Sequence, residues 1–408
     1  MNIGIFIKSN NNKLTGGGYS YENKLVELID KYKFNDCVNI YFIIDKNSLA
    51  NKFQKKCIGI DYHKIYNSYW TIKKRIIRRI FSLDIFNKIG INNFAITEYD
   101  NYYKNEINKI LLNNDINTIY FITPGSEDYG VPYISTHWDL GHVSMYAFPE
   151  VTANNKFENR ERYHRVNLRK SLAIITESKK SIDELIRYEN INPERIWEMP
   201  MFPSNVVELK IDNRLINDVL NNYNLIKDRF FFYPAQFWAH KNHYTLIVAF
   251  SEFLKDKNNA DFKLILSGSD AGGNLSYIKD VVSNLGLNNR VIFTGFVDDI
   301  SIYAFYKSAA ALIMPTLLGP TNMPLLEAYY IGCPVICSDL EGHREILENN
   351  ALYFNPLSWQ EILKKMKTIL VESERYKYNE QSHEKFNNTM KLLDNILYEI
   401  QKVRRLFK

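Results

Sequence analysis

Cysteine is scarce in this chain of 408 residues, which contains only Cys37, Cys57, Cys333 and Cys337. Four thiols over this length do not make a disulfide framework, and they fit a reducing compartment. Cys333 and Cys337 have no second Cys or His pair near them, so we interpret them as small apolar residues of the core. No D-x-D pair and no His/Cys cluster with metal spacing occurs. The sequence therefore predicts no metal site and no cofactor.

Long hydrophobic runs are also lacking. No window approaches the roughly 18 consecutive apolar residues that a membrane-spanning helix needs. The first ten residues, MNIGIFIKSN, lack the apolar core of a signal peptide and are predicted to form a first strand. We therefore expect a cytoplasmic protein.

A strong excess of charge of one sign is missing as well. The net charge is +5, charged residues make up 24% and hydrophobic residues 46%, which is ordinary for a globular protein. Such a mild positive balance favours anionic ligands but excludes the typical nucleic-acid-binding protein. No G-x-S-x-G or Ser-His-Asp pattern indicates a serine hydrolase.

Short apolar runs alternate with helical patterns along most of the chain, which predicts an α/β fold with parallel sheets. The predicted strands are Ile3–Lys8, Val38–Ile44, Thr118–Thr123, Tyr133–Thr136, Ala173–Thr176, Phe230–Tyr233, Lys263–Ser267, Val291–Thr294, Leu312–Met314 and Val335–Cys337. Two prolines between Pro200 and Ser204 suggest a hinge between two domains that face each other across a cleft. Beyond about Trp359 the chain is predicted to be helical, and its last helix is expected to pack back onto the first domain. The predicted boundaries are 1–202, 203–380 and 381–408.

The stretch from Ala309 to Glu345 organises the second half. It contains a buried strand, a turn with Gly319 and Pro320, a helix that starts at Thr321 and Asn322, and a second strand. In such a unit the loop and the helix N-terminus lie at the carboxyl edge of the sheet, where open α/β sheets bind ligands. The free N–H groups and the dipole at the helix start predict a phosphate site.

One segment departs from this alternation. Trp70–Phe86 places apolar residues at helical spacing and surrounds them with Lys73, Lys74, Arg75, Arg78 and Arg79. It has two interpretations. The first is a basic amphipathic helix that lies on the inner face of an anionic membrane, and the second is a core-packed helix with a solvated basic face.

Four motifs of the second half resemble the nucleotide-sugar domain of retaining glycosyltransferases of the GT-B fold, family four. They are PAQFWAHKNH, LILSGSDAGGN, NNRVIFTGFVDD and GPTNMPLLEAYYIGCPVICSD. The resemblance covers residues 230 to 357 strongly and the first half more loosely. It implies two Rossmann-like domains that face each other across a cleft.

The resemblance also implies roles for single residues. Lys241 matches the lysine that grips the donor diphosphate, and a fixed cation there stabilises the leaving group. Glu327 matches the second glutamate of the family's E-x7-E motif, which holds the ribose hydroxyls. The remaining donor-binding residues expected in this half are Gln236, Phe296, Val297, Thr321, Asn322 and Met323.

Two positions depart from the family pattern. Gly319 stands where the first glutamate of E-x7-E is expected, and Gln236 stands where an arginine is more common. The site has thus lost one negative and one positive group together. This fits a working subgroup with altered sugar contacts, and it also admits an inactive relative.

In the first half, Gly16, Gly17 and Gly18 follow the first strand and match the family's glycine-rich loop, where the backbone approaches a phosphate or sugar closely. A plain strand–helix turn would explain them as well. His137 ends a strand within THWDLGH and matches the cleft histidine that contacts the donor sugar. Weaker candidates for the cleft or the acceptor site are Asp139, His142, Glu177 and Lys179.

The resemblance implies retaining transfer of a hexose, with mannose or a related sugar as our guess, from a GDP- or UDP-sugar to a saccharide or lipid-linked glycan. His137, Lys241 and Glu327 would be the catalytic residues, without a metal. Two alternatives remain open: a non-catalytic GT-B subunit that binds glycan or a partner transferase, and a GT-B sugar-nucleotide epimerase.

Overall fold

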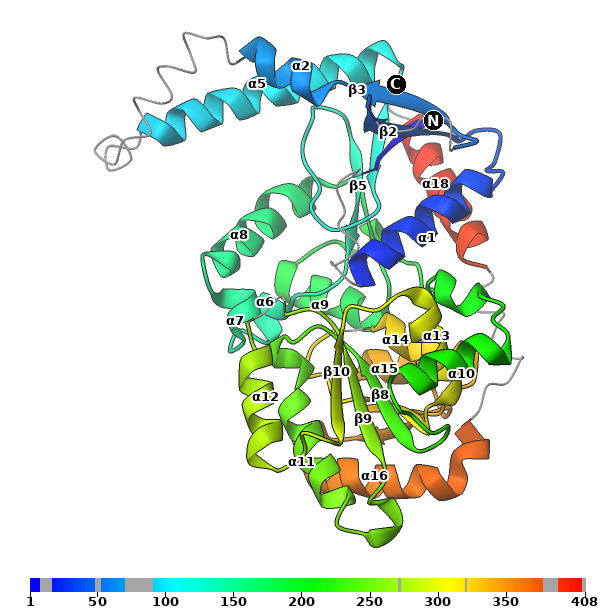
Figure 1. Ribbon diagram of the computed structural model, residues 1–408. Coiled ribbons are helices and arrows are strands. Elements are labelled where there is room, and N and C mark those ends of the chain that lie inside the picture. Colours follow the sequence, from blue (N-terminus) through cyan, green and yellow to red (C-terminus); the bar gives the residue numbers. More distant parts are fainter. Residues whose placement is uncertain are drawn as a thin grey trace.

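The computed structural model describes residues 1–7, 17–47, 53–69, 91–270, 273–319, 321–376 and 388–405. Within these ranges the chain forms two sheets with helices packed around each (Figure 1). Residues 199–204 connect the last strand of the first sheet to the first helical turn of the second half. Every paired strand in both sheets is parallel, as the alternation of apolar runs and helical patterns predicts.

The first sheet has seven strands in the order β3-β2-β1-β4-β5-β6-β7. Its centre is almost completely buried, because helices cover both faces; all residues of β4, β5 and β6 are buried. Ile3 in β1 lies opposite Ile40 in β2 and Thr118 in β4. The strands are β1 Asn2–Phe6, β2 Asn39–Asp45, β3 Lys56–Ile60, β4 Thr118–Phe121, β5 Tyr133–His137, β6 Ala173–Thr176 and β7 Ile196–Glu198.

Two apolar clusters cover the faces of this sheet. Helix α1 packs on one face through Leu25 and Ile29, and helix α5 packs on the other through Ile107 and Leu111. The helical segments of this half are α1 Gly17–Lys31, α2 Tyr62–Tyr69, α5 Ile91–Asn113, α6 Gly141–Ser144, α7 Pro149–Thr152, α8 Lys156–Arg162, the π-helix η3 Tyr163–Leu168, α9 Lys179–Glu189 and the short 3₁₀ turn η4 Pro193–Arg195.

The C-terminal helix α18, Thr389–Arg405, packs against the first sheet rather than the second. Figure 1 shows it beside α1, far along the sequence from that helix. Leu393 and Leu397 are fully buried in the same cluster as Ile3, and Arg404 donates a hydrogen bond of 2.8 Å to the Thr118 hydroxyl. The prediction that the last helix returns to the first domain is therefore confirmed.

The second sheet has six strands in the order β10-β9-β8-β11-β12-β13. The central strand β8 carries three consecutive phenylalanines, Phe230 to Phe232, and all three are fully buried. The strands are β8 Phe230–Pro234, β9 Lys263–Ser267, β10 Val291–Gly295, β11 Ala311–Met314, β12 Val335–Ser338 and β13 Leu352–Phe354.

The helices of the second half begin and end at ordinary helix signals. The Asp212, Asp298 and Ser358 side chains cap three of them, and Gly332, at φ +86°, ends α14. The helical segments are η5 Asn205–Glu208, α10 Asn213–Asn222, η6 Ala239–Lys241, α11 His243–Phe253, η7 Lys257–Asn259, α12 Leu275–Asn284, α13 Asp299–Ser308, α14 Met323–Ile331, α15 Glu341–Leu347, α16 Trp359–Glu372 and η8 Ser373–Tyr376.

The two facing Rossmann-like sheets confirm the fold class predicted from the sequence. The prediction missed the strands β3, β7 and β13. Each of them forms an edge of its sheet and carries little apolar signal. Within the described ranges, none of the helices is long and apolar enough to cross a bilayer. The segment Trp70–Phe86, for which membrane contact and core packing were the two interpretations, lies outside the described residues, and so does Gly16.

Candidate active site between the two sheets

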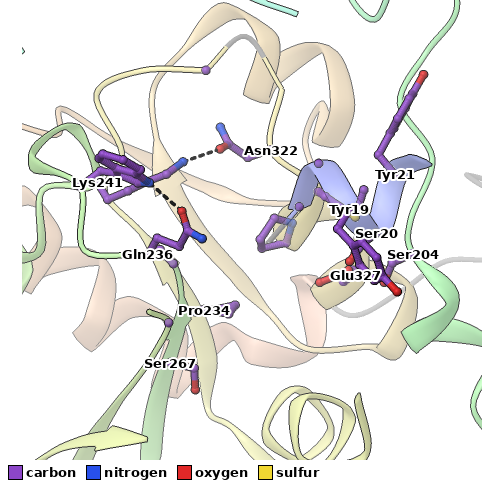
Figure 2. A pocket seen from close by; sticks show the side chains of 18 of the residues that line it. Tyr19, Ser20, Tyr21, Ser204, Pro234, Gln236, Lys241, Ser267, Asn322 and Glu327 are labelled. Carbon is purple, nitrogen blue, oxygen red and sulfur yellow. Dashed lines mark hydrogen bonds between the residues drawn. The ribbon is translucent and has the colours of Figure 1, made fainter. Parts of the chain in front are cut away.

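A cavity of about 780 Å³ lies between the two halves (Figure 2). Its walls come from segments that follow the carboxyl ends of strands in both sheets, which is where open parallel sheets bind ligands. The volume is in the range of small-molecule and cofactor sites. All the predicted donor-binding residues of the second half line it: Gln236, Lys241, Phe296, Val297, Thr321, Asn322, Met323 and Glu327.

Lys241 ends the 3₁₀ turn η6, directly after the strand β8 and its loop. Its Nζ donates a hydrogen bond of 3.0 Å to Oδ1 of Asn322 (Figure 2). Burial lowers the pKa of Lys241 to about 8, although Asp139 and Glu150 act in the opposite direction. An anion that entered the cavity would favour the charged ammonium and would compete with Asn322 for it.

A short chain of hydrogen bonds fixes the orientation of Asn322. The His343 ring contacts the Ser338 carbonyl through Nδ1 at 2.9 Å, so Nδ1 carries the proton. His343 Nε2 is then the acceptor for the Asn322 amide group, also at 2.9 Å, which turns Oδ1 of Asn322 toward Lys241. His343 is fully buried and acts on the cavity only through Asn322.

The helix α14 begins at the cavity. Its N-cap residue is Asn322, whose side chain serves Lys241 and His343 and makes no capping hydrogen bond, and Pro324 stands in the first turn. Because Thr321, Asn322 and Met323 line the cavity, the positive end of the helix dipole faces it. Lys241 and this helix start together make a site suited to a phosphate or diphosphate.

Glu327 lies one turn into α14, with 8% of its surface exposed. One carboxylate oxygen accepts a hydrogen bond from the Ser204 hydroxyl, and the other accepts one of 2.9 Å from Tyr306. Burial raises the pKa of Glu327, although the two hydroxyls lower it. The carboxylate is thus held in one orientation at the cavity wall and has lone pairs left for a ligand.

The two departures from the family pattern have a clear local structure. Gly319 has φ +116°, and a Cβ atom there would lie 2.9 Å from Nδ2 of Asn322. A glutamate at 319 would therefore require a different turn. Gln236 accepts a hydrogen bond of 2.7 Å from the Trp238 indole, so it positions that ring at the cavity.

The first half contributes a different wall. Gly17 and Gly18 line the cavity at the start of α1, and a Cβ at Gly18 would lie 3.3 Å from the Trp138 ring. Asp139 also lines it and forms an ion pair of 2.6 Å with Arg160. Burial would raise the pKa of Asp139, but Arg160 and the Gly141 N–H lower it below its usual value.

The structure does not place His137 in the cavity wall. Its side chain is buried beside His164, with the ring centroids 5.5 Å apart, while the next residues, Trp138 and Asp139, line the cavity. His137 Nε2 has no hydrogen-bond partner among the described residues, and burial lowers the pKa of this ring to about 4. His137 is therefore a neutral ring directly behind the wall, and its catalytic role remains a prediction.

Several polar contacts join the halves around the cavity. Glu177 accepts a hydrogen bond from the Thr321 hydroxyl, and Glu150 contacts both the backbone N–H and the ring of His240. Glu345 of α15 caps α9, because its carboxylate accepts from the N–H groups of Lys179 and Lys180 at 2.9 and 3.0 Å. The structure thus represents a state in which the halves are closed on each other.

Several lining residues were not found from the sequence. They include Tyr19, Ser20, Tyr21, Glu150, Arg160, Ser204, Trp238 and His240. Trp238 and His240 lie in the motif PAQFWAHKNH and Ser204 lies in the predicted hinge, so their positions could have pointed to them. Of the weaker candidates, Asp139 and Glu177 line the cavity, whereas His142 and Lys179 are not among its lining residues.

Two parallel sheets with a cavity between their carboxyl edges define the GT-B fold of glycosyltransferases. Comparison with known proteins agrees with this class. Residues 221–386 match the family described as Glycosyl transferases group 1, so this part of the chain is similar to a domain of that family.

The chain is 27% identical over 201 residues to the O-antigen chain mannosyltransferase RfbU of Salmonella typhimurium, covering 46% of this chain and 54% of that protein. It is 33% identical over 103 residues to the uncharacterized glycosyltransferase MJ1607 of Methanocaldococcus jannaschii, covering 25% of each. The chain therefore spans a quarter to about half of the length of these relatives.

Among solved structures, that of Anabaena HepE in complex with UDP-glucose is similar over nearly the whole chain. The TM-score is 0.66 at 14% identity, with 98% of this chain and 100% of that chain covered. At 14% identity, this similarity shows only that the two proteins share a fold. The shared fold includes both halves of this chain.

Proposed function

We propose that this protein is a retaining glycosyltransferase that moves a hexose from a nucleoside-diphosphate sugar to a saccharide or lipid-linked glycan. The observation that carries the proposal is the pairing of Lys241 with the N-terminus of α14 at one end of the cavity. Transfer from such a donor expels a diphosphate, and a fixed cation and helix dipole at that place stabilise the charge that develops.

The rest of the cavity fits the remaining parts of the donor. Glu327, held by Ser204 and Tyr306, is positioned to accept hydrogen bonds from ribose hydroxyls. The loop that contains Phe296 and Val297 follows β10 and lines the adjoining wall, where we place the base. The sugar would then point toward Gly17, Gly18 and Trp138 of the first half.

The mechanism that we propose needs no protein nucleophile. The departing phosphate would take the acceptor proton on the same face of the sugar, as the family resemblance implies for retaining transfer. Lys241 and the helix amides would carry the charge of the leaving group without a metal ion. Positioning and electrostatic stabilisation would then account for the rate.

Mannose is our choice of sugar, because RfbU carries the name of an O-antigen chain mannosyltransferase. The UDP-glucose in the HepE complex supports a sugar nucleotide as the class of donor. A surface-polysaccharide intermediate is the acceptor class that we propose. Contact with the inner face of a membrane through Trp70–Phe86 remains part of the proposal.

A non-catalytic GT-B subunit is the competing function, because Gly319 and Gln236 remove two charged groups of the family pattern. A thermal-shift series with UDP, GDP, UDP-glucose and GDP-mannose separates the two. A ligand at 100 times its Kd stabilises a protein by about 2.7 kcal/mol. We expect one nucleotide class to raise Tm in the wild type and in the surface variant Lys255→Ala, but much less in Lys241→Ala.

If no nucleotide raises the Tm of the wild-type protein, the proposal fails and the binding subunit is favoured. An epimerase would also bind a sugar nucleotide, so product analysis with the donor alone provides the second arm. An epimerised nucleotide sugar formed without acceptor would contradict transfer. Transfer to an added saccharide, observed by mass spectrometry, supports it.

A further inference from the structure

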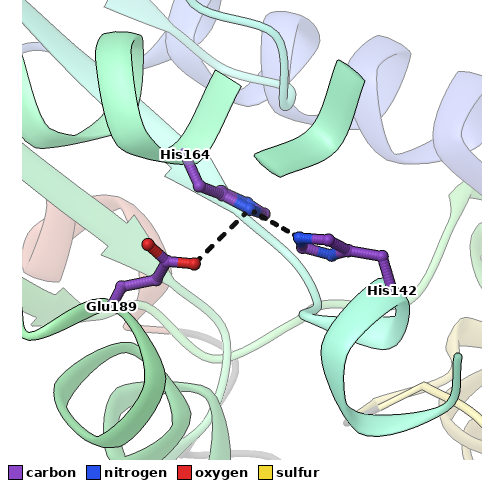
Figure 3. Close-up of side chains that lie close together, drawn as sticks. All are labelled: His142, His164 and Glu189. Atoms are coloured by element: carbon purple, nitrogen blue, oxygen red, sulfur yellow. Dashed lines mark hydrogen bonds and ion pairs between the residues drawn. The ribbon is translucent and has the colours of Figure 1, made fainter. Parts of the chain in front are cut away.

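A second group of polar side chains lies in the first half, behind the wall that Trp138 and Asp139 form. His142 comes from α6, His164 from the π-helix η3 and Glu189 from the last position of α9 (Figure 3). All three side chains are buried, with relative exposures of 0%, 3% and 4%. The proposed transfer reaction uses none of them.

The distances in this group match those between the ligands of one small metal ion. His142 Nε2 and His164 Nδ1 are 3.3 Å apart, and His164 Nδ1 lies 3.9 Å from Oε1 of Glu189. The three ligand atoms all lie within 4.8 Å of one another. Two nitrogens bound to a tetrahedral Zn²⁺ at about 2.05 Å are roughly 3.3 Å apart, so the two rings already have the required spacing.

A hydrogen-bonded pair of neutral histidines is the simpler explanation of the 3.3 Å contact. It does not account for the third member, because 3.9 Å is too long for a hydrogen bond between His164 and Glu189. The Glu189 carboxylate is buried and faces His164, and a buried carboxylate is stabilised by a cation beside it. An ion between the three groups would join them all and would need only a small movement of Glu189.

Two further features fit a metal site. Oε1 of Glu161 lies 3.2 Å from Nε2 of His142, so a second carboxylate is available as a fourth ligand. His164 belongs to a π-helix, a rare distortion that often occurs at functional sites. His142 also lines a second cavity, together with Val143, Tyr146 and Phe157.

We propose that His142, His164 and Glu189 bind a divalent zinc ion, with Glu161 or a water as the fourth ligand. Imidazole nitrogens and carboxylate oxygens are the ligands that suit Zn²⁺. The ion would tie together α6, η3 and the end of α9, and so would hold in place the loop that leads from β5 to the cavity wall. This inference does not depend on the proposed transferase activity.

The test uses the full chain after treatment with a chelator and its removal. Zn²⁺ is titrated by calorimetry, bound metal is counted by mass spectrometry, and Tm is followed at each concentration. We expect one equivalent of zinc and a Tm that rises with zinc concentration. The variants His164→Gln and Glu189→Gln should each weaken binding by at least about tenfold, by comparison with second-sphere losses of 10- to 100-fold.

His63→Gln is the matched control, because His63 is an exposed histidine on α2 outside the cluster. It should bind zinc as the wild type does. The proposal would be overturned if folded wild-type protein bound no zinc. It would also be overturned if His164→Gln bound zinc as tightly as the wild type. If His164→Gln does not fold, the near-isosteric Glu189→Gln and the metal content of the wild type still decide the question.

Discussion

The two halves of the molecule build the same cavity in different ways. The second half supplies most of its groups from compact stretches that follow the strands β8, β9, β10 and β11, namely Pro234–Lys241, Ser267–Ser269, Gly295–Asp299 and Gly319–Glu327. The first half supplies the start of α1, Gly17–Tyr21, and single residues or adjacent pairs from several separate segments, such as Trp138, Arg160 and Glu177. A site for a phosphate group can be encoded in short motifs, because one loop and one helix start are sufficient to bind an anion.

The wall of the first half depends on long-range packing instead. Thr321 and Glu177 are 144 positions apart in the sequence and meet only because the halves close on each other. We therefore expect the second half to determine nucleotide binding and the first half to determine how the sugar and acceptor are placed. The following predictions test this division, from the largest expected effect to the smallest.

Removing the cation of the second half should have the largest effect. Lys241→Ala is expected to lower kcat/KM by more than about tenfold, equivalent to about 1.4 kcal/mol, because the leaving diphosphate loses its fixed positive charge. Steady-state kinetics at a saturating acceptor concentration measures this change in kcat/KM. Lys255→Ala, on the surface of α11's C-terminal end, is the matched control. An unchanged kcat/KM in Lys241→Ala would remove this lysine from the mechanism.

Restoring the family glutamate at 319 should destabilise the protein rather than improve it. Gly319 has φ +116°, and any Cβ there would lie 2.9 Å from the Asn322 amide. Gly319→Glu is expected to cost about 1–3 kcal/mol, the usual range for strained backbone. Thermal unfolding measures the loss. Gly319→Ala is the control, because it introduces the same strain without the charge; a stable and more active Gly319→Glu would contradict this account of the turn.

The buried carboxylate at the contact between the halves should make stability depend on pH. Burial raises the pKa of Glu177 to about 8, well above the 4.5 of a solvated glutamate. The folded protein then holds a proton that the unfolded chain has lost, so stability is greatest below about pH 4.5 and falls as pH rises toward 8. The substitution Glu177→Gln removes this carboxyl group and its contribution to the pH dependence of stability.

Relative to Glu177→Gln, the wild type is expected to lose more than about 1.4 kcal/mol between pH 5 and pH 8, the equivalent of one pKa unit. Calorimetric unfolding at several pH values measures the difference. The exposed Glu158→Gln is the control and should follow the wild type. Parallel pH profiles of wild type and Glu177→Gln would show that this carboxyl has an ordinary pKa.

The smallest effect is expected at the edge of the contact between the halves. Glu345→Ala removes the carboxylate that caps α9 and should destabilise the closed state by about 1 kcal/mol, as other lost helix caps do. Small-angle scattering should then show a larger radius of gyration. Glu341→Ala breaks only the exposed ion pair with Lys180 and is the control. Equal scattering of both variants would argue against a role of Glu345 in closure.

Much of the fold was predictable because parallel strands buried on both faces are continuous apolar runs. Ala173–Thr176 and Lys263–Ser267 were predicted with the bounds that the structure has. The helices from α6 to η3 were not predicted. They are short, are held by tertiary contacts and carry no helical period of their own. The edge strands β3 and β13 were missed because partial exposure interrupts their apolar runs.

The residues of the candidate site also divide into those that the sequence predicted and those that it did not. Lys241 and Glu327 were predictable because they lie in two motifs that resemble a known family, and Asn322 because it stands at a helix start that follows a strand. The contact of Glu150 with His240 joins residues 90 positions apart, and no local pattern indicates it. The cluster of His142 and His164 spans 22 positions and includes Glu189 from a third element, so the search for metal spacing in the sequence did not detect it.

The central claim is that a nucleoside diphosphate binds between Lys241 and the start of α14. A crystal structure of the protein with the nucleotide that gives the largest rise in Tm tests this most directly. We predict that the diphosphate contacts Lys241 Nζ and the backbone N–H groups of Asn322 and Met323, with the ribose at Glu327. A nucleotide bound elsewhere, or a cavity closed by the protein's own side chains, would contradict the account.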